Sequence, residues 1–345
     1  MTRLVGVFLE QATHCEHLGS RFMARLLRLL ANHWPIDTAL TQRLEAWQGD
    51  IGPNGASLPL RLAAALHALV LTGQAAQLRT NYPPHQTSDN QLFKAVQTTM
   101  THHHIFIDNW LSYPPQTNEV ARSAGLIPAA MWLQQHHQLP ICLSELGASA
   151  GLNLGFDHFA LTVSGHRFGP EQPVLHLTPD WHGPVPTGIW PHITERRGVD
   201  FNPLDPRRPE DATRLTAYLW LDQPKRIART HATIAHHSAV INTGDAIDWL
   251  AHRLEHPRVG QLHLIYHTIA WQYFPRSQQA RGRALLAHAG AQATKHAPLP
   301  WLSIEADTTG QSGAAIRLRL WPANVTFSLG RADFHGRWID WTPPI

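Results

Sequence analysis

Residues 139–156, which read LPICLSELGASAGLNLGF, constrain the fold of this chain more than any other stretch. A short apolar run, residues 141–144, lies between a proline and Glu145, and a bounded run of this kind predicts a buried strand. Small residues follow at 147–151, and glycine lets a backbone turn tightly or approach another group closely. The stretch therefore predicts a strand, a tight turn and a short helix within an α/β fold.

The spacing of apolar residues elsewhere in the sequence predicts two domains. Residues 1–137 have apolar residues at helical spacing, as in 18–32, where Ser20 is a candidate cap, and predict an all-helical N-terminal domain. Residues 138–345 predict strands alternating with helices, and hence a mostly parallel sheet that ends in an antiparallel hairpin. The further strands are expected at 193–200, 239–242, 262–267 and 301–306, and the hairpin at 315–321 and 325–332. Single helices are expected at 92–111 and 210–236.

Composition excludes several classes of protein. A length of 345 residues, 43% hydrophobic and 15% charged, suits a globular protein of about two domains. The formal net charge of +3 is too small and too scattered to indicate a nucleic-acid partner. No stretch is long enough to span a membrane, and the N-terminus does not resemble a secretory signal. Two cysteines, Cys15 and Cys142, form no disulfide framework, which fits a cytoplasmic location.

Histidine is abundant, with 25 residues that include a run at 102–104. Adjacent residues of a strand or helix point in different directions, so such a run rarely shares one ion. We therefore expect no metal site.

Two chemistries compete for the turn at 147–151. Written E-x-G-x-x-x-G, it resembles the first motif of Rossmann-like S-adenosylmethionine (SAM) methyltransferases. Written G-x-S-x-G, it is a nucleophile elbow with Ser149 as the acyl acceptor, and Asp245 and His267 follow in the required order. The elbow leaves Glu145 and Asp200 without a role, and no His-Gly-Gly oxyanion segment precedes it. A third interpretation is a tight turn that binds nothing.

Three acidic residues favour the SAM interpretation, because each falls at the end of a predicted strand. Glu145 ends the first, Asp200 ends the second and suits the ribose hydroxyls, and Asp245 follows the third and suits the adenine. Otherwise Asp200 is a turn residue and Asp245 a helix cap. The remaining expected cofactor-binding residues belong to the turn and its helix: Gly147, Ser149, Gly151 and Asn153.

The methyl acceptor is expected beyond the ends of the strands. His267 at the end of the fourth strand is the candidate general base, and Glu119 the second candidate catalytic residue. Asn118 precedes the helix that leads into the first strand, and it is expected to bind substrate together with Trp271, Gln272 and Tyr273. The alternatives are a packed strand-end histidine, a helix-start glutamate and core aromatic residues.

Five segments together resemble an uncharacterised bacterial family, the domain of unknown function twenty-three thirty-two. They are QTNEV at 116–120, ELGASAGLNL at 145–154, RRGVDFNPLD at 196–205, YHTIAWQYFP at 266–275 and FHGRWIDW at 334–341. The resemblance implies a SAM-methyltransferase-like Rossmann domain behind a helical domain. The fourth segment is not of the Asn-Pro-Pro-Tyr type, which argues against methylation of DNA or protein amides.

A cytoplasmic methyltransferase for a small molecule is the expected function; the alternatives are a serine hydrolase with a Gly-Ala-Ser-Ala-Gly elbow and a non-catalytic nucleotide-binding protein. The sequence leaves the oligomeric state open.

Overall fold

The computed structural model describes residues 2–36, 38–53 and 55–344, and the chain forms two compact units. The first comprises Met1–Thr117 and Pro206–His231, and the second Asn118–Asp205 and Ala232–Ile345. This division differs from the expected boundary at 137/138. The helix at 123–137 belongs to the sheet-containing unit, and the segment 206–231 returns to the helical one.

The helical unit is built around α4, of which twelve residues are buried. Its predicted cap at Ser20 is confirmed, since the Ser20 hydroxyl accepts a hydrogen bond from Met23 N at 3.1 Å. The same hydroxyl donates to Asp222 Oδ1 at 2.6 Å, which ties the returning segment to α2. The helices are α1 (Arg3–His17), α2 (Arg21–Asn32), α3 (Ala39–Glu45), α4 (Leu58–Leu71), α5 (Ala76–Arg79), α6 (Asp89–His102), α7 (His104–Leu111), α9 (Pro209–Ala217) and α10 (Pro224–Ala235), whose last residues belong to the second unit.

Two predictions of a single long helix in this unit are wrong, because each segment forms two helices. The one at 92–111 is interrupted at His103, where α6 ends and α7 begins. The one at 210–236 is interrupted between α9 and α10 over residues 218–223. In the second case Pro224 opens α10, and proline disfavours a helical conformation in the residue before it.

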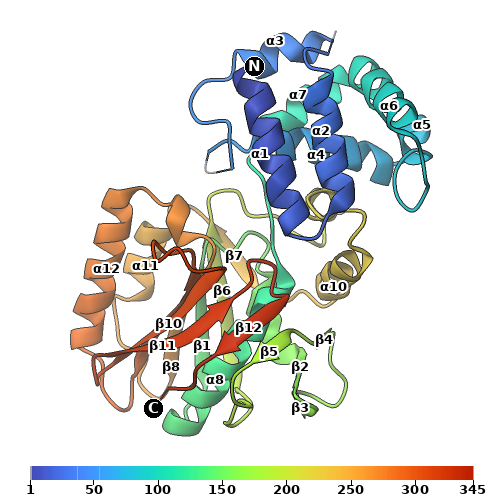
Figure 1. Cartoon of the computed structure of the whole chain (residues 1–345). Coiled ribbons are helices and arrows are strands. Elements are labelled where there is room, and N and C mark those ends of the chain that lie inside the picture. Colours follow the sequence, from blue (N-terminus) through green and yellow to red (C-terminus); the bar gives the residue numbers. More distant parts are fainter. Residues whose placement is uncertain (1, 37, 54, 345) are drawn as a thin grey trace. The chain divides into compact units, whose positions relative to one another are not determined.

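The second unit contains a nine-stranded sheet in the order β5-β12-β11-β10-β9-β8-β1-β6-β7 (Figure 1). Neighbours from β7 to β9 are parallel, whereas β9 to β12 are antiparallel to one another. The parallel strands are β1 (Ile141–Leu146), β6 (Ile193–Asp200), β7 (Val240–Thr243), β8 (Leu262–Thr268) and β9 (Leu299–Glu305). The others are β10 (Ala314–Trp321), β11 (Val325–Ala332), β12 (Trp338–Trp341) and β5 (Asp180–His182). A small second sheet contains β2 (Ala160–Val163), β3 (His166–Phe168) and β4 (His176–Leu177).

Helices cover both faces of the large sheet (Figure 1). On one face lie α11 (Ala246–Arg253) and α12 (Arg276–Ala291), whose apolar residues pack with Leu146 and Ile265. On the other lie α8 (Ser123–His137), whose Gly125 packs against Ile304 and Ile316, and η2 (Leu152–His158). The remaining short helices of this unit are η1 (Val120–Arg122) and η3 (Trp271–Tyr273).

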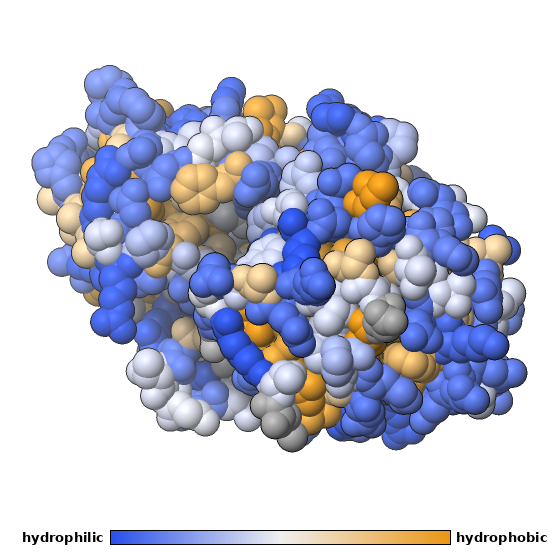
Figure 2. Space-filling view, turned by 90° about the horizontal axis from the view of Figure 1, so that it is seen from above, coloured by the Kyte–Doolittle hydropathy of each residue, from blue (hydrophilic) through white to orange (hydrophobic). Residues whose placement is uncertain are grey.

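The α/β class, the mostly parallel sheet and the C-terminal hairpin are confirmed. The expectation missed β5 and β12, which extend the sheet beyond the hairpin, because both are short and interrupted by polar residues. No helix within the described residues is long and apolar enough to cross a membrane. Hydrophilic residues dominate the face shown in Figure 2, with apolar residues in separate patches between them.

Candidate functional site

The small-residue turn after β1 lies at the carboxyl end of the parallel strands, where β6 holds it closely. The amides of Gly147 and Ala148 donate to the carbonyl oxygen of Val199 at 3.0 and 2.9 Å. Ser149 N donates to Asp200 Oδ2 at 2.8 Å, and Asn202 N donates to the other oxygen of Asp200 at 2.9 Å. Asp200 therefore fixes the turn to the end of β6.

Both predicted cofactor-binding glycines are explained by packing of the chain itself. Gly147 and Gly151 each have φ near +70°, a conformation that favours glycine. A Cβ at Gly147 would lie 2.6 Å from the Cβ of Ala270, and a Cβ at Gly151 would lie 2.4 Å from Ile241 Cδ1. These glycines thus allow the segment after β8 and the strand β7 to approach the turn.

The segment 118–123 wraps around the turn. Asn118 Oδ1 accepts a hydrogen bond from Leu152 N at 2.8 Å, at the first residue of η2. Asn153 is fully buried; in the amide orientation that satisfies its neighbours, its nitrogen donates to Ser123 Oγ at 2.8 Å and to the Val120 carbonyl at 3.3 Å. The structure thus brings together Asn118 and Asn153, which the sequence assigned to substrate and cofactor.

Glu145, the last residue but one of β1, is 2% exposed and lies beside Tyr266 of β8. The Tyr266 hydroxyl donates to Glu145 Oε2 at 3.2 Å. Burial raises the pKa of Glu145 to about 8, while the Tyr266 hydrogen bond and the charge of Arg122 act in the opposite direction. Arg122, which the sequence analysis did not single out, also donates to the carbonyl oxygens of Thr268 at 3.2 Å and Phe334 at 2.9 Å.

His267 lies on the opposite face of the sheet from Glu145, because side chains alternate along a strand and Tyr266 is the neighbour in register with Glu145. Its Nδ1 is 2.7 Å from Glu305 Oε1, and its Nε2 accepts a hydrogen bond from Trp301 Nε1 at 3.0 Å. The ring stacks on Trp271 with 4.9 Å between centroids. Both ring nitrogens are therefore engaged, and the imidazole is held as the Nδ1–H tautomer.

Glu305, whose side chain is 13% exposed, is the partner of this imidazole. Its Oε1 also accepts from the amides of Ala270 at 2.9 Å and Trp271 at 3.1 Å. Burial alone would raise the pKa of Glu305, but the interactions with His267 and with the two amides outweigh it, so that this pKa lies below its ordinary value. The carboxylate thereby fixes the segment that follows β8.

The other predicted site residues have different surroundings. Asp245 caps α11 through Ile247 N at 2.8 Å and accepts from Gln278 Nε2 at 3.0 Å. Glu119 caps η1 through Ala121 N at 3.2 Å. Ser149 is 5% exposed and has φ of +53°. In η3, Trp271 is buried, whereas Gln272 and Tyr273 are exposed.

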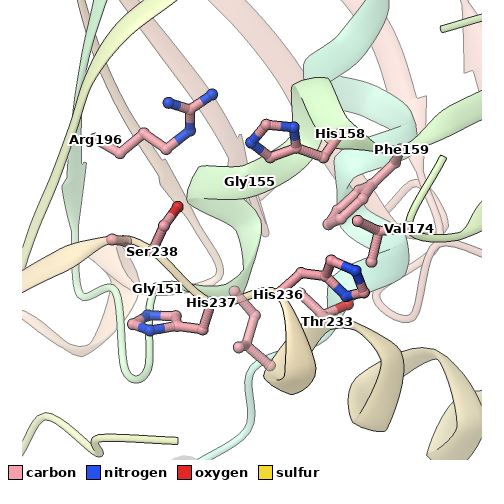
Figure 3. Close-up of a pocket in the computed structure, with 12 residues that line it drawn as sticks. Gly151, Gly155, His158, Phe159, Val174, Arg196, Thr233, His236, His237 and Ser238 are labelled. Atoms are coloured by element: carbon pink, nitrogen blue, oxygen red, sulfur yellow. The ribbon is translucent and has the colours of Figure 1, made fainter. Parts of the chain in front are cut away.

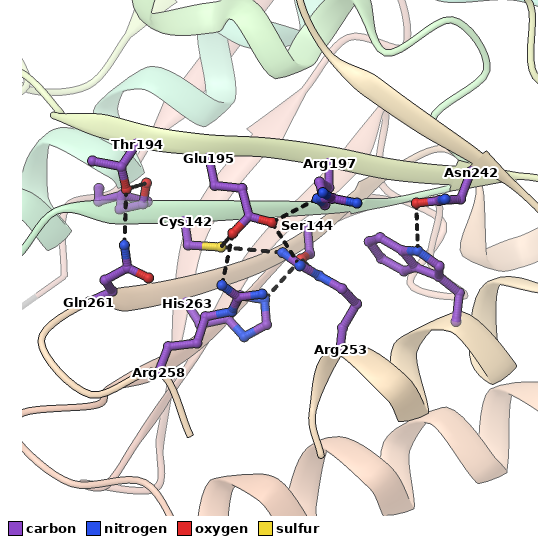
Figure 4. Close-up of polar contacts among 12 residues, drawn as sticks. Cys142, Ser144, Thr194, Glu195, Arg197, Asn242, Arg253, Arg258, Gln261 and His263 are labelled. Carbon is purple, nitrogen blue, oxygen red and sulfur yellow. Dashed lines mark hydrogen bonds and ion pairs between the residues drawn. The ribbon is translucent and has the colours of Figure 1, made fainter. Parts of the chain in front are cut away.

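A second polar network, on the α11 face, was not predicted from the sequence (Figure 4). Glu195 of β6 accepts hydrogen bonds from Arg253 and Arg258, both at 2.8 Å, and forms an ion pair with Arg197 at 3.0 Å. Cys142 Sγ donates to the same carboxylate at 3.2 Å, and Ser144 Oγ lies 2.9 Å from His263 Nε2. The sequence signal was available in the polar residues at 195 and 197, which alternate with residue 196 and therefore share one face of the predicted strand.

The five segments that carry the family resemblance gather at the carboxyl end of the sheet. The turn, which is part of the second segment, contacts the third segment through Asp200 and the fourth through Ala270. The first segment reaches the turn through Asn118, and a Cβ at Gly336 of the last segment would lie 2.4 Å from the Ala121 carbonyl oxygen. Segments scattered over more than 200 residues thus build one candidate site.

These features define an α/β protein with a mostly parallel sheet and a candidate site at the carboxyl ends of its parallel strands. The model of a family described as uncharacterised protein conserved in bacteria (DUF2332) matches residues 6–341, and the chain belongs to that family. A comparison with curated proteins gives no match.

Proposed function

We propose that the carboxyl edge of the sheet binds SAM and transfers its methyl group to a small acceptor. The parallel strands, numbered along the chain, lie in the order third, second, first, fourth, fifth. Doubly wound sheets of this order bind ligands outside the carboxyl ends of the strands where the order reverses, here between β1 and β8. The small-residue turn and the segment after β8 meet at that point.

The hydrogen bonds already made by the turn favour one class of cofactor over another. Nucleotide phosphates bind to free backbone N–H groups at such a turn. Here protein acceptors take five of these groups, those of Gly147, Ala148, Ser149, Gly151 and Leu152. The turn is therefore poorly suited to a pyrophosphate, and an adenosyl cofactor without phosphates fits it better. SAM is such a cofactor, and it supplies the electrophilic methyl group.

Asp200 can accept further hydrogen bonds from the adenosyl part of the cofactor. A carboxylate offers about four lone-pair sites, and Asp200 uses two of them for the amides of Ser149 and Asn202. Its remaining sites suit ribose hydroxyls. Asp245 is committed to capping α11 and to Gln278, so its role near the adenine stays a prediction.

The acceptor side contains the exposed Gln272 and Tyr273 of η3. His267 and Glu119 stay predicted catalytic residues. For His267 to take a proton, Nε2 must first lose its hydrogen bond from Trp301. A small acceptor is favoured over a nucleic acid, because the basic residues of this chain form no stripe in the sequence.

The hydrolase alternative is less well supported. Ser149 has the positive φ typical of a strained turn, but its side chain is nearly buried. The two ring nitrogens of His267 are bonded to Glu305 and Trp301, so neither can activate a serine in this arrangement. Asp245 is occupied as a helix cap.

Calorimetric titration of the full chain with SAM, S-adenosylhomocysteine and NAD tests the proposal. We expect the two adenosyl compounds to bind and NAD not to bind. Asp200→Asn keeps an acceptor for the turn but loses charge, and should weaken binding about tenfold. The matched control is Asp248→Asn, an exposed carboxylate paired with Arg281, which should bind like the original protein. Failure of folded protein to bind either adenosyl compound would overturn the proposal.

A further inference from the structure

A cavity that is open to solvent lies between η2, β6 and the residues that precede β7 (Figure 3). Its apolar walls include Leu152, Phe159 and Val174. Its polar lining residues are His158, Arg196, Thr233, His236, His237 and Ser238. All belong to the sheet-containing unit, and the sequence analysis assigned a role to none of these polar residues, although Gly151, an expected cofactor-binding residue, also lines the cavity.

Arg196 supplies the permanent charge of this cavity. Its side chain is 17% exposed and is paired through one terminal nitrogen with Asp157. Its Nε is buried and has no hydrogen-bond partner among the described residues. A buried guanidinium nitrogen without an acceptor is costly, and such groups commonly mark the place of a bound water or ion.

Two further polar side chains line the cavity together with Arg196. In Figure 3 the imidazole of His158 and the hydroxyl of Ser238 are directed toward the side of the cavity from which the Arg196 side chain extends. Arg196 lies on the η2 face of β6, and His158 is the last residue of η2. A guanidinium cannot accept a hydrogen bond, whereas the imidazole and the hydroxyl can both donate.

We propose that this cavity binds a small oxyanion, a phosphate, sulfate or carboxylate group, held by Arg196, His158 and Ser238. An oxyanion presents several acceptors to several donors, and it can accept a charge-assisted hydrogen bond from the Nε that the pair with Asp157 leaves without an acceptor. A metal ion is a poorer occupant, because the described residues contain no group of three or more His, Cys, Asp or Glu that could hold one. The inference does not depend on SAM binding at the carboxyl edge.

Titration of the full chain with inorganic phosphate, and separately with acetate, at constant ionic strength tests this site. We expect a phosphate Kd on the order of 1 mM. Arg196→Gln should weaken binding about tenfold, because it removes a charge-assisted hydrogen bond. The matched control is Arg197→Gln, since Arg197 is the next residue of β6 and faces Glu195 on the other side of the sheet. This control should bind phosphate like the original protein.

Two variants at exposed positions keep the test informative even if Arg196→Gln fails to fold. His158→Gln and Ser238→Ala change exposed side chains, and each should weaken binding about three- to tenfold while the circular dichroism spectrum is unchanged. If Arg196→Gln unfolds, these two variants decide. Preference for acetate over phosphate identifies a carboxylate ligand and supports the site. Absence of binding of either anion, an equal loss in Arg197→Gln, or unchanged binding in both exposed variants would overturn it.

Discussion

Tyr266 donates a hydrogen bond to Glu145 across 3.2 Å, and this contact joins the ends of the two strands between which the order of the sheet reverses. Both residues are buried, and burial raises the pKa of each. The buried Glu145 and the partly buried Glu305 lie at one edge of the sheet, and their pKa values are shifted in opposite directions. The difference arises because Glu305 has a histidine and two amides as partners.

The first prediction concerns Glu145 and pH. The pKa of Glu145 in the folded state, about 8, lies above the ordinary value of 4.5, so folding takes up a proton between these pH values. The free energy of unfolding therefore falls as pH rises through this window. Glu145→Gln cannot ionise, and its stability relative to the original protein should increase by a few kcal/mol between pH 5 and about pH 9. Urea denaturation at several pH values measures this.

Glu305→Gln is the matched control, because the pKa of Glu305 is shifted in the opposite direction and the pH dependence of stability should therefore be reversed. Because the pKa of Glu305 is lowered in the folded state, its contribution to stability is present above the ordinary pKa of 4.5 and is lost as pH falls through the folded-state value. The variant should therefore be less stable at pH 7, with the difference narrowing in acid. A pH-independent difference for Glu145→Gln would show that Glu145 is not neutral in the folded protein at pH 7.

A second prediction tests how Asn118 holds the turn. Asn118→Leu removes the acceptor of Leu152 N and should reduce the free energy of unfolding by roughly 1–3 kcal/mol. Asn118→Asp keeps an oxygen at the start of η2, where a negative charge is favourable, and should keep more stability than the leucine variant. Equal losses in the two variants would mean that the hydrogen bond is not what matters.

The third prediction compares two glycines with similar backbone conformations. Gly147 has φ of +70° and no space for a Cβ, whereas Gly165 has φ of +80° and nothing within 4 Å of the added atom. Gly165→Ala adds strain alone, and Gly147→Ala adds strain and a clash with Ala270. Thermal and urea denaturation should show an excess loss of about 1–3 kcal/mol for Gly147→Ala. If the two losses are equal, the turn has room that a cofactor can use.

A fourth prediction separates support from catalysis at His267. His267→Asn can keep the donor to Glu305, whereas His267→Phe keeps only the stack on Trp271 and leaves Trp301 Nε1 without its acceptor. The phenylalanine variant should lose about 2–4 kcal/mol more stability than the asparagine variant. If His267 is the general base, His267→Asn should reduce methyl-transfer kcat about 100-fold or more with an unchanged Kd for SAM. Unchanged kcat would leave His267 a structural residue.

The sequence predicted the parallel strands and the hairpin because their apolar runs are bounded by clear turn residues. It also placed Asp200 and Asp245 at strand ends correctly, but it could not show that both carboxylates are used by the chain itself. Such contacts depend on tertiary distances that spacing does not encode. Side chains alternate between the two faces along β8, and Tyr266 is in register with Glu145, so His267 lies on the opposite face from Glu145. The sequence did not reveal this register, and it therefore could not predict that the two residues lie on opposite faces.

The units differed from the expected boundary for a comparable reason. The segment 206–231 contains the amphipathic helix α9 and most of the amphipathic helix α10, and a local pattern does not reveal which core an amphipathic helix joins. The hydrogen bond between Ser20 and Asp222 links positions 202 residues apart. The Glu195 network was missed because arginines far along the chain, Arg253 and Arg258, supply its partners.

The last prediction concerns Cys142, which lies fully buried in that network. Its Sγ is 3.2 Å from Glu195 Oε2 and 3.3 Å from a terminal nitrogen of Arg253. Burial raises the pKa of the Cys142 thiol to about 12, even though Arg258 and Arg253 act to lower it. Burial likewise raises the pKa of the Cys15 thiol to about 12. Because the thiolate is the reactive form, both thiols should react with a disulfide reagent only as fast as the protein opens. Arg253→Met removes a cation from the carboxylate and should speed modification of Cys142, while Cys15, in the helical unit, keeps its rate as an internal control. Rapid labelling of Cys142 in the unmodified native protein would contradict this packing.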